Sequence, residues 1–440
     1  MIHRHRAARG PAALLAALLV GSALVDGRGA GALAGDGWIA GGAGPSAVHT
    51  VAVGAHPYAI AVDERVARVY VVSLGHVIGS QLPSSGHASL YTLDATTGRV
   101  LHVTPLGFVR YPGWDLGQLA APPPQALAVD EQAGRVFVLS TSPVDASGKP
   151  TAPGRVIVLD AMTSTRLGSS PAGPFPYAVA VAERAGRIVV ADSNAPGAMS
   201  IVDATHGRLL RTVPAGAGPQ ALAVDDRRGR VVVMTHSGAT ILDVATGALR
   251  ATVRLGQVPC ALAFDRHTGQ AFLGVGVSRG NPTTVYRLDV ATGTLVGQTV
   301  IPYQATSSDD ACPLAADAAA GRVLVFHTPY YMGGSAFFSL LDSHSGHRLL
   351  TDALNPDETY QGASAALAVD ERAGHFLVSM GLDRKVRVLD ARTGRLVRVV
   401  RVGRGPQALA VDERLARVFV ANLGDGTVSI FDERGTQTTA

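Results

Sequence analysis

The feature that most constrains the fold is a short apolar phrase, ending in aspartate, that recurs eight times along the chain. In the first copy it reads Ala-Ile-Ala-Val-Asp, and successive copies start 40 to 67 residues apart. Repetition at this spacing predicts one supersecondary unit used many times, not a single irregular core. The copies span residues 59–63, 126–130, 178–182, 221–225, 261–265, 313–317, 366–370 and 408–412.

Each copy opens a unit of four short runs that read as strands. A turn separates the phrase from a β-branched run, such as 231–233, and a third run ends on a second aspartate, such as Asp243. A fourth run follows, usually after a Thr-Gly pair. A helical reading fails, because glycine turns and β-branched residues interrupt every run of apolar residues with the 3.6-residue period of a helix. Four antiparallel strands that are apolar on both faces bury themselves by stacking around an axis, so we predict an all-β, eight-bladed β-propeller.

The two ends of the repeat complement each other. Residues 48–53 read as a fourth strand with no three strands before it, whereas the last unit stops at Asp432 after its third strand. We expect the N-terminal strand to complete the last blade, because such a clasp closes the ring and removes open sheet edges.

The repeats resemble the YVTN-type β-propeller repeat family, a class that includes exported bacterial propellers. The match is clearest at residues 418–432, which read Val-Phe-Val-Ala-Asn-Leu-Gly-Asp-Gly-Thr-Val-Ser-Ile-Phe-Asp, and it extends over residues 46–435. Ala182 in place of a first aspartate and Ser164-Thr165 in place of Thr-Gly depart from the pattern. The resemblance implies a fold and says little about activity. Because the family is better known with seven blades, seven is the alternative count.

The first 34 residues read as a cleavable secretory signal peptide. A basic N-terminal region precedes the apolar run 12–25, and Ala32-Leu33-Ala34 has the small-x-small pattern that precedes a signal-peptide cleavage site. The apolar run is too short to span a bilayer comfortably. We therefore expect a signal peptide at 1–34, a linker at 35–45 and the propeller at 46–440. The mature chain would have no transmembrane segment and would be secreted or periplasmic.

The net charge argues against two classes of partner. The full chain carries +4, but the signal peptide contains four arginines and one aspartate, so the mature chain carries +1. A near-neutral chain has no electrostatic footprint for nucleic acid or for an anionic membrane. We expect a monomer without a nucleic-acid partner.

The aspartates that recur in every unit are interpreted as turn residues. Aspartate that opens a turn accepts hydrogen bonds from backbone amides two or three residues further on. A residue present in every blade cannot mark a single site, so binding residues are sought where the repeat is broken.

Extra residues collect in two kinds of connection, which leave the same side of an up-and-down blade. These connections join the second strand to the third, or the fourth strand to the next blade. Loops on a rigid scaffold are where binding residues usually lie. Aromatic and acidic side chains in these loops suit a sugar, a peptide or an amine, although the rings could instead pack the loops onto the disk. The candidate ligand-binding residues in the loops are Tyr111, Trp114, Asp309, Asp310 and Tyr330.

The residue five positions before each first aspartate is expected to ring the mouth of the central channel. Cys260 and Cys312 hold this position in neighbouring blades, where their expected separation suits a disulfide in an exported chain. Two free thiols, or a metal or redox pair, are the alternatives. The other predicted pocket residues at this position are Tyr58, Gln125, Tyr177, Gln220 and Gln407.

These observations favour a noncatalytic exported binding protein. Its ligand would be a small molecule, glycan, peptide or protein on the loop-rich face, and no cofactor is predicted. The alternative is a metal-dependent hydrolase or lyase, lactonase-like, that holds a divalent metal at the channel mouth through His236 and His327. A redox propeller is less favoured, because the sequence has no Cys-x-x-Cys-His haem attachment motif.

Overall fold

The computed structural model describes residues 48–75, 85–110, 125–140, 151–193, 196–276, 282–304, 313–327, 336–354, 365–381 and 383–435. All of them belong to one compact unit, Pro45–Ala440. None of these residues lies in a helix, so this part of the chain has no helix long and apolar enough to cross a membrane.

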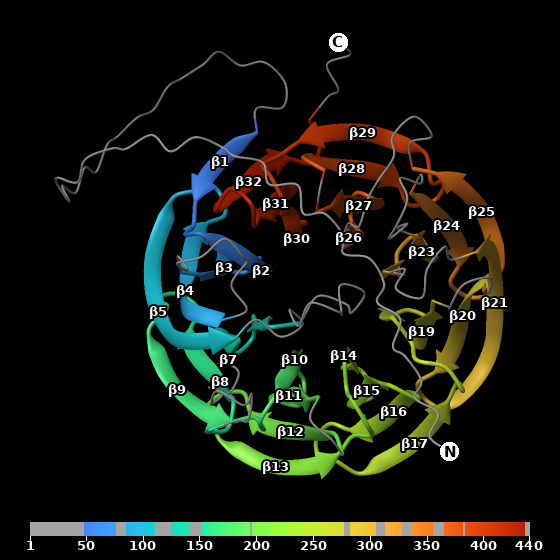
Figure 1. Ribbon diagram of the computed structural model, residues 1–440, viewed down its shortest axis with the longest axis horizontal. Helices are drawn as coiled ribbons and strands as arrows, with labels where there is room; N and C mark the ends of the chain where they lie inside the picture. The colour runs from blue at the N-terminus through green and yellow to red at the C-terminus, as the bar shows by residue number, and fades with distance from the viewer. Residues whose placement is uncertain are drawn as a thin grey trace, which may run out of the picture. The chain divides into compact units, whose positions relative to one another are not determined.

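The strands form eight antiparallel sheets of four, one for each repeat, arranged as a ring of blades (Figure 1). Blade 1 comprises β2 (His56–Asp63), β3 (Arg68–Leu74), β4 (Ser85–Asp94) and β5 (Val100–Arg110), and blade 2 comprises β6 (Leu127–Asp130), β7 (Arg135–Ser140), β8 (Arg155–Asp160) and β9 (Arg166–Pro171). Blade 3 comprises β10 (Pro176–Ala182), β11 (Arg187–Asp192), β12 (Ala198–Asp203) and β13 (Leu209–Pro214), and blade 4 comprises β14 (Ala221–Asp225), β15 (Arg230–Thr235), β16 (Gly238–Asp243) and β17 (Leu249–Arg254). Blade 5 comprises β18 (Ala261–Asp265), β19 (Gln270–Val275), β20 (Pro282–Asp289) and β21 (Thr294–Gln304), and blade 6 comprises β22 (Leu314–Asp317), β23 (Arg322–His327), β24 (Phe337–Asp342) and β25 (Arg348–Ala353). Blade 7 comprises β26 (Ala365–Asp370), β27 (His375–Met380), β28 (Lys385–Asp390) and β29 (Leu396–Arg401), and blade 8 comprises β30 (Pro406–Asp412), β31 (Arg417–Asn422), β32 (Thr427–Asp432) and β1 (His49–Ala52).

The last blade is completed by the N-terminal strand, as the sequence predicts. β1 pairs antiparallel with β32, with Val51 opposite Val428, and the Val53 N–H donates to the Gly426 carbonyl at 2.9 Å. The innermost strands of all neighbouring blades are in contact, including β2 with β30. The ring therefore closes with eight blades, and the seven-blade alternative is wrong.

Each pair of neighbouring blades shares one buried apolar cluster. On β7, Val136 and Val138 pack towards blade 1, whereas Phe137 and Leu139 pack towards blade 3. Successive side chains of a strand point to opposite faces, so every blade is buried on both sides. A blade thus owes its stability to both of its neighbours.

The recurring aspartates cap turns, which confirms their interpretation as structural residues. Asp63 Oδ1 accepts the Val66 N–H at 3.1 Å, and the other six first aspartates accept an equivalent bond. The eight second aspartates also accept backbone N–H groups in their turns. Hydrogen bonds from Arg250 and Thr246 lower the pKa of Asp243 to about 2. These carboxylates are fixed parts of the scaffold.

Ser164 shows how the scaffold tolerates a departure from the Thr-Gly pair. It adopts a left-handed φ of 55°, a conformation that usually requires glycine. Its N–H donates to the Asp160 carbonyl at 2.8 Å, as the Gly98 N–H does to Asp94 at 2.8 Å in blade 1. Its hydroxyl lies 2.6 Å from Thr92 Oγ1 in that blade, so the substituted turn gains a contact between blades.

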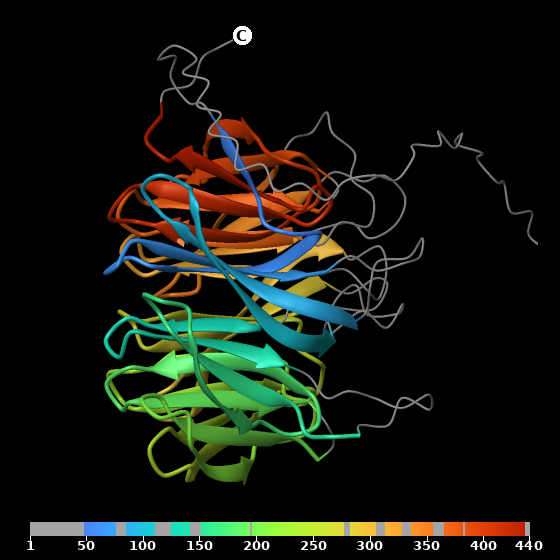
Figure 2. The same cartoon turned by 90° about the vertical axis from the view of Figure 1, so that its left-hand side faces the viewer.

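The antiparallel strand order sorts the connections onto two sides of the disk (Figure 2). The capped turns lie on one side. Second and fourth strands end on the other side, where third strands and the next first strands begin. The long insertions of the sequence are attached on this second side, called here the loop side.

Candidate ligand-binding site

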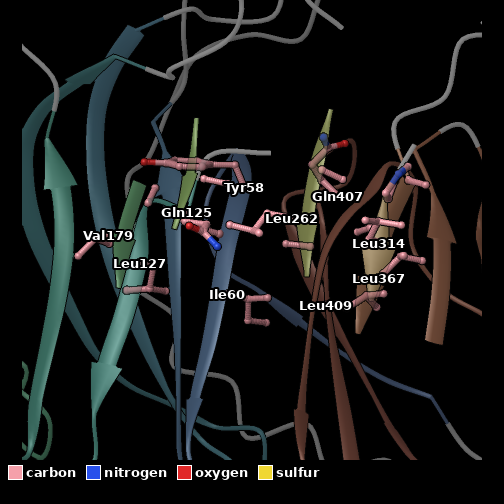
Figure 3. A pocket seen from close by; sticks show the side chains of 18 residues that line it. Tyr58, Ile60, Gln125, Leu127, Val179, Leu262, Leu314, Leu367, Gln407 and Leu409 are labelled. Atoms are coloured by element: carbon pink, nitrogen blue, oxygen red, sulfur yellow. The ribbon is translucent and has the colours of Figure 1, made fainter. Parts of the chain in front are cut away.

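The first strands of all eight blades surround a cavity of about 450 Å³ on the axis of the ring (Figure 3). Its wall is mostly aliphatic. Ile60, Leu127 and Leu262 come from the second position of the repeated phrase, and the equivalent residues of four other blades also line the cavity. The described residues that line the cavity are Tyr58, Ala59, Ile60, Gln125, Ala126, Leu127, Val179, Ala221, Ala261, Leu262, Pro313, Leu314, Ala365, Ala366, Leu367, Gln407, Ala408 and Leu409.

The polar residues of this lining lie towards one end. Tyr58, Gln125 and Gln407 come from the loop-side ends of their first strands; in Figure 3 the Tyr58 and Gln407 side chains lie at that end, and the Gln125 side chain lies below Tyr58. Among the lining residues that the structure describes, none is an acid, a lysine, an arginine or a histidine. The cavity therefore offers hydrogen bonds at its mouth and an uncharged apolar wall below.

Backbone bulges determine where two of these side chains point. The pairing of β2 with β3 shifts register between Pro57 and Ala59, and that of β30 with β31 shifts between Pro406 and Ala408. A bulge redirects the extra residue, here Tyr58 and Gln407, away from the regular alternation.

Two of the predicted mouth residues do not reach the cavity. Tyr177 lies at the same bulge position in β10, but it is buried between blades 3 and 4, with 8% of its surface exposed. Gln220 is half-buried beside β14 and is not part of the lining. The structure thus brings together three of the five mouth residues that we predicted.

Gln125 makes the most specific contact at the mouth. Its Nε2 donates to the Leu222 carbonyl at 3.2 Å, and its Oε1 accepts the Leu222 N–H at 3.0 Å. Gln125 belongs to blade 2 and Leu222 to blade 4, so the side chain passes the first strand of blade 3. The Gln125 carbonyl also accepts the Val179 N–H of blade 3 at 2.9 Å. One residue thus connects three blades.

The loop candidates lie outside the described residues. These are Tyr111, Trp114, Asp309, Asp310, Tyr330 and also Cys312. Cys260 is described; it directly precedes β18, and its Sγ accepts the Gly276 N–H at 3.0 Å.

The two histidines of the metal alternative differ in environment. His327 ends β23 with 1% of its surface exposed, and this burial lowers its pKa to about 4. His236 is exposed, and its ring packs over Gly218. Within the described ranges, no group of three or more His, Cys, Asp or Glu side chains could hold a metal ion.

A ring of carboxylates at the opposite ends of the first strands was not predicted from the sequence. The Glu64 N–H donates to Glu131 Oε1 at 2.9 Å, and the Glu413 N–H donates to Glu64 Oε1 at 2.8 Å. Each acid thus reaches back to the backbone of the preceding blade. Burial raises the pKa of Glu64, and neighbouring acidic charges contribute to this rise. The members of the ring are Glu371, Glu413, Glu64, Glu131, Glu183 and Asp226.

The signal for this ring was present in the repeat. An acid follows the first aspartate in most copies, as in Asp63-Glu64 and Asp412-Glu413. The bonds hold neighbouring first turns together, so we assign these acids a structural role between blades.

Comparison with known proteins supports the propeller fold but does not assign the chain to a family. No protein-family model and no curated protein match the chain. Solved structures do match. The Dos1 propeller aligns with a TM-score of 0.62 at 13% identity, covering 89% of this chain and 96% of that one. The computationally designed Ika8 protein aligns with a TM-score of 0.59 at 18% identity, covering 87% of this chain and 97% of that one. BamB from Moraxella catarrhalis aligns with a TM-score of 0.53 at 15% identity, covering 87% of this chain and 98% of that one. What they share is the propeller.

Proposed function

We propose that this chain is an exported, noncatalytic binding protein of the YVTN-type repeat class, and that its ligand enters the central channel from the loop side. The signal-like residues 1–34 support export. The near-neutral mature chain supports a partner other than nucleic acid. The protein would act as a monomer, since one closed ring contains the whole cavity.

The cavity on the axis carries this proposal. Its volume of about 450 Å³ lies within the range of small-molecule sites, roughly 300 to 1,000 Å³. Such sites combine a mainly apolar wall with a few placed polar groups, and this one has Tyr58, Gln125 and Gln407 at its mouth. The repeated carboxylates are engaged in turn caps and blade contacts, which favours binding over catalysis.

The alternative function, a metal-dependent hydrolase or lyase, requires a different arrangement of side chains. It requires His236 and His327 to approach one ion together with Asp309 or Asp310. If the channel is a simple binding site, dialysis against EDTA leaves ligand binding unchanged, and purified protein contains no stoichiometric metal.

Blocking the channel tests the proposal directly. Leu314 lines the cavity and is half-buried, so Leu314→Arg places a solvated charge in the apolar wall. We expect at least a tenfold loss of affinity for the neutral fluorescent probe N-phenyl-1-naphthylamine, measured by fluorescence titration. The control is Leu349→Arg on the outer strand of the same blade, where Leu349 is 47% exposed. Equal binding by both variants and the wild type would contradict a ligand site in the channel.

We further propose a disulfide between Cys260 and Cys312 at the channel mouth. Ala261 and Pro313, the residues that follow them, both line the cavity from neighbouring blades. In protein purified without reductant and then unfolded, we expect no titratable thiol before reduction and two after it. Two reactive thiols before reduction would show that the bond is absent.

A further inference from the structure

The walls of the channel are made of strand edges. Each first strand is the terminal strand of its sheet, so one row of its N–H and C=O groups has no neighbouring strand. Such an edge is a template for another extended chain. The edges of eight sheets converge on the cavity, whose wall is otherwise aliphatic.

The contact of Gln125 shows how one of these edges accepts an amide. The Leu222 N–H and C=O are both bonded to the Gln125 carboxamide, at 3.0 and 3.2 Å. Leu222 is in register with Val233 on β15, but its N–H and C=O bond to Gln125 of blade 2, so these groups face away from β15, on the free side of β14. A carboxamide and a peptide bond present the same donor and acceptor. The side chain therefore occupies the edge as the backbone of an added strand would.

We propose that the channel binds an uncharged, extended peptide or peptide-like amide, whose backbone bonds to the inner edges, and that Gln125 occupies the β14 edge in its absence. This inference rests on the proposed function of the channel. A peptide fits because its alternating side chains meet the aliphatic wall while its amides meet the strand edges. A carboxylate or an amine would be desolvated here without a counter-charge from the wall, since the described lining residues carry none.

The length of the channel limits the ligand. A first strand of the repeated phrase has five residues, as in β14, and an extended chain rises roughly 3.3 Å per residue. A segment of about four residues therefore spans the wall. Tyr58 and Gln407 at the mouth would contact the end that remains on the loop side.

Gln125 competes with the ligand for Leu222, which gives the proposal its test. The probe is acetyl-Ala-Val-Ala-Leu-amide, and its analogue replaces the central amide by an ester, which removes one N–H donor. Isothermal titration with Gln125→Ala is expected to show about tenfold tighter binding of the amide probe than the wild type, because two hydrogen bonds become available. The ester analogue is expected to bind less tightly than the amide to both proteins. The control Gln220→Ala, outside the lining, leaves both affinities unchanged.

The outcomes separate this inference from the proposed function. Equal affinities for the amide and the ester, or no gain in Gln125→Ala, would overturn amide recognition while the neutral dye still binds the channel. Failure of the dye to respond to Leu314→Arg would overturn both. Tighter amide binding in Gln125→Ala that Leu314→Arg then abolishes supports both.

Discussion

Replacing Val53 by aspartate is expected to lower the free energy of unfolding by about 3 to 5 kcal/mol, because it buries an unpaired charge where the ring closes. Val53 follows β1 and is 0% exposed, within the apolar cluster shared by blades 8 and 1. Its N–H is also bonded to Gly426, so the residue cannot move aside without breaking the clasp. Urea denaturation followed by circular dichroism measures the loss.

The adjacent residue provides a matched control. Ala52 is exposed and pairs with Thr427, so Ala52→Asp adds the same charge to the same strand without burying it. We expect a change within about 0.5 kcal/mol. Light scattering should show association for Val53→Asp alone, because an open clasp leaves β32 as an unpaired edge. Equal destabilisation by the two substitutions would contradict a closure that depends on burial at Val53.

The sequence predicts the blades and their closure because their causes are local and repeated. Each strand has its own pattern of apolar residues, and each turn has its own capping aspartate or an equivalent residue. Eight copies make the pattern visible even where Ala182 or Ser164 breaks it. The clasp follows in the same way, because residues 48–53 lack partners within the sequence-predicted units.

The details of the channel mouth have causes that are neither local nor repeated. Gln125 bonds to Leu222, 97 residues away and two blades further round. Nothing in either segment specifies the other. Tyr58 and Tyr177 share a bulge position in sequence and both are buried against a neighbouring blade, yet only Tyr58 is among the described residues that line the cavity. Equal positions in a repeat predict equal backbone, whereas side-chain placement depends on the neighbouring blade.

The acidic ring marks a different limit of sequence reasoning. The Asp-Glu pair was visible, and the aspartate was correctly interpreted as a turn cap. The glutamate bonds to the backbone of the preceding blade, which becomes its neighbour only when the ring forms. The contact between Glu64 and Glu413 joins residues 349 apart, so only the closed fold reveals it.

A second large effect is expected at the C-terminal end of the last blade, where Glu433→Ala should cost about 2 to 3 kcal/mol. The Glu433 side chain is fully buried, with 0% exposed, and its Oε1 bonds to His375 Nδ1 of blade 7. The adjacent backbone is held by Arg398, which donates to the Gly435 carbonyl at 2.9 Å and the Glu433 carbonyl at 2.8 Å. Removing the carboxylate leaves His375 half-buried without its acceptor.

The pH dependence distinguishes this ion pair from simple packing. The hydrogen bond that His375 donates to the Glu433 carboxylate raises the pKa of His375 above its ordinary value of 6.5, against the opposing effect of burial. A cation stabilised in the folded state contributes its full stability below the unfolded pKa and loses it as the pH rises through the folded pKa. The wild type should therefore lose more stability between pH 6 and pH 9 than Glu433→Gln, which retains the shape but not the charge. Urea unfolding of both proteins at the two pH values measures this difference. An identical pH dependence in the two proteins would show that the His375 pair contributes no charge-dependent stability to the contact between blades 7 and 8.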